Sequence, residues 1–73
     1  MGKSIRTKEY QSFAVKLKRA RLEAGLTQVQ VSKKLKHPQS YISKAEAGEQ
    51  RLDIVELKKF AELYKKDFHY FIK

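Results

Sequence analysis

The chain contains no cysteine and no tryptophan, and only one proline and three glycines among its 73 residues. Without cysteine it can form no disulfide framework and carry out no thiol chemistry, which fits a reducing compartment such as the cytoplasm. Lysine or arginine interrupts every apolar run after a few residues, so we expect neither a signal peptide nor a membrane-spanning helix. The absence of tryptophan also argues against a helix anchored at a membrane surface.

The length indicates a single domain with a small core. A domain of 73 residues buries little apolar surface and is marginally stable, so support from a partner subunit is plausible. Residues 1–8 are basic and lack helical periodicity, and we expect them to form a flexible arm. Residues 9–73 are then the folded domain.

Positive charge is in excess and unevenly distributed along the chain. Seventeen Lys and Arg residues against eight Asp and Glu residues give a net charge of +9 at neutral pH. Residues 1–25 carry +5, residues 26–52 carry +3 and residues 53–73 carry +1. This distribution indicates a surface for an anionic partner, with nucleic acid as the first candidate. Charge alone leaves open the alternative of a well-solvated surface without a partner.

The apolar residues recur with helical spacing, and no segment alternates with a period of two, so the sequence predicts an all-α fold of five helices. The first helix is expected to begin at Glu9 and to be stopped by Gly25, a residue suited to the left-handed turn that follows a helix. Its expected apolar face comprises Phe13, Leu17, Ala20 and Ala24.

The second and fourth helices begin with the same capping pattern. Thr27 and Gln30 have the spacing of a capping box, in which each side chain accepts from the other residue's backbone N–H group. Asp53 and Glu56 repeat this spacing at the start of the fourth helix. We expect the second helix over residues 28–35. The residues expected to be buried on these two helices are Val31, Leu35, Leu57, Phe60, Ala61 and Tyr64.

The third helix is expected between Pro38, at its first helical position, and Gly48. Ile42 and Ala45 face the core. The remaining positions carry amides, hydroxyls and one amine, whereas an ordinary solvated face would carry Glu–Lys pairs. These residues are Gln39, Ser40, Tyr41, Ser43 and Lys44.

This polar face suits the base edges of DNA. Gln39 and Ser43 lie one turn apart, as do Ser40 and Lys44, and such side chains offer the hydrogen-bonding groups that read base edges. The second and third helices are too short to be stable alone, and a longer first helix and a capped fourth helix support them. This is the arrangement of a helix-turn-helix, in which the second helix of the pair enters the major groove. A merely solvated polar face is the alternative.

The run LTQVQVSKKLKHPQSYISKAEAGEQ, residues 26–50, resembles the helix-turn-helix of the lambda-repressor-like (XRE, Cro/repressor) family. The resemblance implies a small, cytoplasmic transcription regulator of a bacterium or phage, for example a repressor, that binds an inverted-repeat operator in double-stranded DNA as a homodimer. The alternative is a helix-turn-helix interaction protein, such as an antitoxin, whose main ligand is another protein.

The resemblance also implies roles for individual residues. Three match base-reading positions: Gln39, Ser40 and Lys44. Four match positions that touch the DNA backbone or the groove edge: Gln28, Tyr41, Ser43 and Arg51. Arg21 and Glu46 match two residues that form an ion pair between the first and third helices.

Three positions depart from the family pattern. Lys36 stands where the family usually has glycine, and would adopt a positive φ at some energetic cost. Ala47 replaces a frequent asparagine, which removes one phosphate contact. Ser32 replaces a small alanine of the second helix.

The last helix follows Asp67 and is rich in large apolar side chains, namely Phe68, Tyr70, Phe71 and Ile72. A short helix can bury only one face on its own small core, so part of this set is expected to stay exposed in a monomer. Similar family members pair through their last helices, and we expect these four residues to form the homodimer interface.

No group of residues suggests catalysis or a bound metal. His37 and His69 lie in different expected elements, with no cysteine or carboxylate set beside them. His37 is expected at a helix cap or near a phosphate, and His69 on the surface of the last helix. We therefore expect no enzymatic activity, no metal, no cofactor and no small-molecule ligand.

Overall fold

The computed structural model describes residues 8–72, except for the side chain of Ile72. Its helices are α1 (Lys8–Glu23), α2 (Gln28–Leu35), α3 (Gln39–Glu46), α4 (Ile54–Tyr64) and α5 (Phe68–Ile72). The described residues contain no strand, so the predicted all-α, five-helix fold is confirmed. The expected arm lies outside the described residues except for Lys8, which is the first residue of α1.

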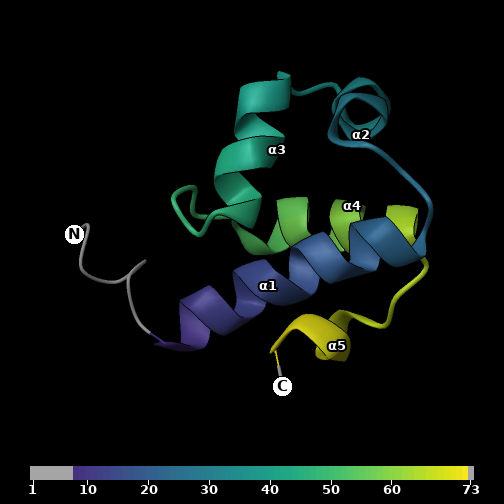
Figure 1. Ribbon diagram of the computed structural model, residues 1–73. Coiled ribbons are helices and arrows are strands. Elements are labelled where there is room, and N and C mark those ends of the chain that lie inside the picture. Colours follow the sequence, from purple (N-terminus) through teal and green to yellow (C-terminus); the bar gives the residue numbers. More distant parts are fainter. Residues whose placement is uncertain (1–7, 73) are drawn as a thin grey trace.

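The two short helices lie on one side of the long helix α1, and α5 lies on the other (Figure 1). The α4 helix runs alongside α1, so these two helices form the centre of the molecule. None of the described helices is long and apolar enough to span a membrane. The arrangement leaves α3 on the outside of the molecule, remote from α5.

Buried side chains from all five helices form one core. Its members are Leu17, Ala20, Val31, Ile42, Ala45, Leu57, Phe60, Ala61, Tyr64 and Phe71. The expected inward position of Ala24 is wrong, because α1 ends at Glu23 and Ala24 is exposed in the turn that follows. Ala14 is buried instead, with 2% of its surface exposed.

The two expected capping boxes differ in the structure. At α2 the box is complete: the Gln30 N–H donates to Thr27 Oγ1 (3.1 Å) and the Thr27 N–H to Gln30 Oε1 (2.8 Å). At α4 the Glu56 N–H donates to Asp53 Oδ1 (2.8 Å). The Glu56 carboxylate, however, lies 2.8 Å from His37 Nε2. The expected role of Glu56 as capping-box partner is therefore wrong, because its carboxylate contacts the His37 imidazole instead.

The start of α3 also differs by one residue from expectation. Pro38 occupies the cap rather than the first helical position, with an extended ψ of 154°. Its carbonyl accepts a hydrogen bond from the Tyr41 N–H (3.0 Å), as the carbonyl of a cap residue does. The helix therefore begins at Gln39, which places this side chain in the first turn.

Candidate nucleic-acid interface

The outward side of α3 is polar along its whole length. Gln39, Ser40, Ser43 and Lys44 are exposed, whereas Ile42 and Ala45 on the opposite side are completely buried. We call these four exposed residues the α3 stripe. The helix stands at the outside of the molecule (Figure 1), so the stripe is accessible to a large partner.

Tyr41 lies beside the stripe and is half-buried. Its ring stacks on the His37 ring, with centroids 4.0 Å apart and planes inclined by 15°. Burial, and the negative charges of Glu56 and Asp53, raise the pKa of the Tyr41 phenol. Its hydroxyl is therefore protonated at neutral pH and can donate a hydrogen bond to an acceptor such as a phosphate oxygen.

The turn between α2 and α3 is tight. Lys36 has a φ of 60°, in the left-handed region where the family usually has glycine. The His37 N–H then donates to the Ser32 carbonyl (3.0 Å) and closes the turn. Ser32, which stands where the family has alanine, is buried. Its hydroxyl donates a hydrogen bond to the Val29 carbonyl (2.7 Å), so this buried polar group has a partner within its own helix.

The same turn is tied to α4 by the contact between His37 and Glu56. His37 lies between Lys36, the C-cap of α2, and Pro38, the N-cap of α3, as expected of a neighbour of a helix cap, and its contact with a carboxylate of α4 is an additional feature. The two residues are 19 positions apart, and the sequence carries no local pattern that pairs them. His69 is exposed on α5, as predicted, and its backbone N–H donates to Asp67 Oδ1 (2.8 Å).

An ion pair buried between α1 and α3 fixes the position of α3. Arg21 Nε lies 2.6 Å from Glu46 Oε2, and Arg21 Nη2 lies 3.1 Å from Glu46 Oε1. The side chains are 9% and 3% exposed, respectively. Arg21 Nη1 also donates to the Leu26 carbonyl (2.9 Å), so the guanidinium holds the start of α2 as well. Such a bidentate, hydrogen-bonded pair can hold two charges out of water.

Gln28 extends this buried network toward the α3 stripe. Its Nε2 donates to Glu46 Oε1 (3.0 Å), and its Oε1 lies 3.5 Å from Gln39 Nε2, at the long end of the hydrogen-bond range. The first residues of α2 and α3 are thus side by side. Gln28 therefore lies between Glu46 and Gln39 and contacts both side chains.

Arg51 lies on the loop between α3 and α4, at residues 47–53, and is exposed. The phenol of Tyr10 on α1 hydrogen-bonds to the backbone of Gln50 and Leu52 on either side of it. The sequence reasoning missed Tyr10, because a contact spanning 40 residues leaves no trace in local spacing.

The apolar residues of α5 divide between the core and the surface. Phe71 is buried, with 2% of its surface exposed, and its ring lies edge-on to Phe13 at 6.2 Å. Phe68 and Tyr70 pack on the core but remain partly exposed. The side chain of Ile72 lies outside the described residues. Of the four expected interface residues, Phe68 and Tyr70 therefore offer apolar surface to a partner.

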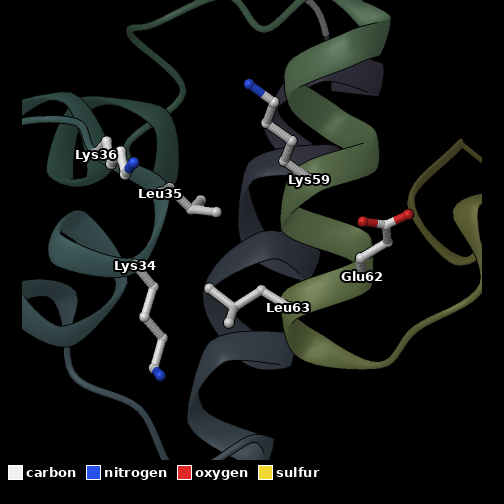
Figure 2. A pocket seen from close by; sticks show the side chains of 6 residues that line it. All are labelled: Lys34, Leu35, Lys36, Lys59, Glu62 and Leu63. Carbon is white, nitrogen blue, oxygen red and sulfur yellow. The ribbon is translucent and has the colours of Figure 1, made fainter.

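A hollow of about 440 Å³ lies between α2 and α4. Figure 2 shows Leu35 of α2 and Leu63 of α4 pointing toward each other across it. Three lysines and one glutamate also line the hollow, namely Lys34, Lys36, Lys59 and Glu62, and the Glu62 carboxylate points away from the two leucines (Figure 2). The hollow shares no residue with the α3 stripe, so it is a separate feature of the surface.

Within residues 8–72, no three His, Cys, Asp or Glu side chains are grouped so that they could hold a metal ion. His37 contacts the Glu56 carboxylate at 2.8 Å. Three or four ligands are usual for a protein-bound transition metal such as zinc.

Two short helices joined by a tight turn, the second presenting a polar stripe, define the helix-turn-helix class of DNA-binding domain. A family model described as Helix-turn-helix matches residues 17–71. The chain belongs to this family, the lambda-repressor-like (XRE) helix-turn-helix proteins, which are DNA-binding regulators. A search of curated proteins finds no significant match.

Proposed function

We propose that the protein is a sequence-specific transcription regulator that binds double-stranded DNA with α3 in the major groove. The observation that carries this proposal is the α3 stripe, whose exposed amide, hydroxyl and amine groups stand on a helix fixed by a buried ion pair. A helix backbone fixed in this way can present these side chains to base edges, because the backbone loses little conformational freedom on binding. Such a regulator acts where the DNA of a bacterium or phage is found, in the cytoplasm.

The proposal assigns each polar residue of this face to one of two roles. Direct contacts to base edges specify the sequence, whereas contacts to phosphate position the protein on the duplex. The base-reading residues are Gln39, Ser40 and Lys44. The residues at the DNA backbone or the groove edge are Gln28, Tyr41, Ser43 and Arg51.

Gln39→Ala is expected to remove sequence preference at one base pair. An amide that bonds a base bidentately contributes about 1–3 kcal/mol of discrimination, so the variant should accept all four bases at that position. Selection of bound DNA from a random-sequence pool measures this directly for the wild type and the variant. Arg51→Ala is the matched control, because loss of a phosphate contact weakens binding to all sequences alike. An unchanged motif for Gln39→Ala would show that the reading face is assigned wrongly.

We further expect the protein to bind DNA as a two-fold dimer. One module reads only a few base pairs, and Phe68 and Tyr70 leave apolar surface on α5 for a second copy. Two symmetric α3 helices about 34 Å apart would require an inverted-repeat operator. Analytical ultracentrifugation of the protein, free and on DNA, tests this. A monomer in both states, together with a selected site lacking inverted symmetry, would contradict it.

The second candidate is a helix-turn-helix interaction protein whose main ligand is another protein, such as the toxin partner of an antitoxin. The hollow between α2 and α4 favours this candidate. Its two leucines could pack against an apolar side chain of a partner, and the lysines that also line it could pair with acidic residues of the same segment. The candidates differ in salt dependence. A protein complex anchored by apolar contacts persists at moderate salt, whereas DNA binding does not.

A further inference from the structure

The loop at residues 47–53 is held to the first turns of α1 by the Tyr10 phenol. The hydroxyl donates to the Gln50 carbonyl and accepts a hydrogen bond from the Leu52 N–H (3.2 Å). These two backbone groups belong to the peptide units that flank Arg51. A single side chain therefore fixes the backbone on both sides of Arg51.

A second contact with α1 fixes the start of this loop. Gly48 has a φ of 78°, and a Cβ atom built there would lie 2.6 Å from Gln11 Nε2. The backbone conformation favours glycine at this position, and the end of the Gln11 side chain packs over it. Two neighbouring residues of α1, Tyr10 and Gln11, therefore contact the loop that carries Arg51.

The loop is also fixed to the end of α3. The N–H groups of Glu49 and Gln50 donate to the Lys44 carbonyl, at 2.9 and 3.2 Å. Lys44 belongs to the α3 stripe. The backbone leading to Arg51 is therefore set relative to the reading helix at one end and relative to α1 at the other.

We propose that Tyr10 is a positioning residue that aims Arg51 at the DNA backbone. This inference rests on the proposed function, in which Arg51 holds a phosphate. An arginine on a mobile loop loses conformational entropy when it binds, and fixing its two flanking peptide units removes part of that cost in advance. Tyr10 thus strengthens binding without itself touching DNA.

The environment of Tyr10 is consistent with this role. Burial raises the pKa of the phenol, although the hydrogen bond from Leu52 and the charge of Arg51 act in the opposite direction. The hydroxyl is therefore protonated at neutral pH and can donate to the Gln50 carbonyl. The ring packs against Phe13, with centroids 5.1 Å apart, and Phe at position 10 would keep this packing while losing both hydrogen bonds.

Tyr10→Phe is expected to lower affinity for the selected operator about five- to tenfold, because two hydrogen bonds that hold the loop are lost. The selected motif should stay the same. The slope of log affinity against log salt should fall toward that of Arg51→Ala, since the phosphate contact is weakened. In an Arg51→Ala background, Tyr10→Phe should cost no further affinity, which is the signature of two residues acting through one contact.

Tyr64→Phe is the matched control. The Tyr64 hydroxyl is buried and has no hydrogen-bond partner among the described residues, so its removal breaks no such bond. The same chemical change is expected to leave operator affinity unchanged. Thermal melts of both variants ensure that binding is measured on folded protein.

Several results would overturn the role of Tyr10. Wild-type operator affinity in Tyr10→Phe would do so, and so would an equal loss in the presence and absence of Arg51, since that indicates a general effect on the fold. If Tyr10→Phe does not fold, hydrogen exchange of the wild type decides, because a rapidly exchanging Leu52 amide would show that the phenol does not hold the loop. A wild-type protein that binds no DNA sequence would refute the proposed function itself, and the role of Tyr10 with it.

Discussion

Glu46→Ala is expected to lower the free energy of unfolding by about 3–5 kcal/mol, because it leaves a buried guanidinium without its counter-charge. Arg21 is 9% exposed at its side chain and cannot turn toward water without disrupting the packing of α1 against α3. Its remaining contact is the Leu26 carbonyl, which carries no formal charge. A domain of this size has a total stability of about 4–11 kcal/mol, so much of it depends on this one carboxylate.

Thermal and urea melts of the wild type and the variant measure this loss. Glu23→Ala is the matched control, because Glu23 also pairs with a cation, Lys66 Nζ at 2.7 Å, but on an exposed surface. Solvent screens such a pair, and the control should melt close to the wild type. Equal melting of Glu46→Ala and the wild type would show that the buried charges do not support each other.

A double replacement separates the ion pair from the space it fills. Arg21→Met with Glu46→Leu removes both charges and keeps apolar volume between α1 and α3. Replacing both members of a buried pair is often neutral, so the double variant should recover much of the stability lost in Glu46→Ala. Gln28 would still lose its acceptor on Glu46, so recovery should be incomplete. A double variant less stable than Glu46→Ala would contradict this account of the pair.

Those parts of the fold that depend on neighbouring residues could be predicted from the sequence. The capping box of Thr27 and Gln30 acts within four residues, and its geometry is as expected. The burial of Ile42 and Ala45 follows from helical spacing alone. In each case the determining interactions are local.

Contacts between distant segments could not be predicted in the same way. Glu56 has the spacing of a capping box but contacts His37, which the tight turn brings next to α4. In the sequence, nothing distinguishes Tyr10 from other residues of α1, because its contact is with the loop at residues 47–53, which is distant along the chain. Only the family resemblance predicted the ion pair of Arg21 and Glu46, because helical periodicity does not pair residues that are 25 positions apart.

The division of α5 shows a further limit of sequence reasoning. Counting large apolar groups indicated that one short helix could not bury all of them, but not which would be buried. Phe71 packs edge-on to Phe13 in the core, whereas Phe68 and Tyr70 stay partly exposed. Which of these residues is buried depends on the rotation of α5 against α1. That rotation cannot be read from the residues of α5 alone. Phe71 is therefore part of the core, whereas Phe68 and Tyr70 keep the exposed apolar surface that the expected dimer requires.

Operator affinity is expected to fall by orders of magnitude as salt is raised, because the net charge of +9 is concentrated in the part of the chain that forms α1 to α3. Each Lys or Arg that neutralises a phosphate releases condensed counterions, and added salt opposes that release. A dimer with about six to ten phosphate contacts loses affinity by about 10³- to 10⁵-fold between roughly 50 and 200 mM salt.

Titration of the selected operator at several salt concentrations gives the slope of log affinity against log salt, which counts the phosphate contacts. Arg51→Ala should reduce its magnitude by about one per subunit. Lys65→Asn is the matched control, because it removes the same unit of charge at the end of α4 and suits the left-handed backbone there, where φ is 56°. Its slope should equal that of the wild type, because contacts at the duplex rather than net charge set the number of counterions released. Affinity independent of salt would exclude docking of α3 in the major groove, and equal changes in slope for both variants would show that Arg51 makes no phosphate contact of its own.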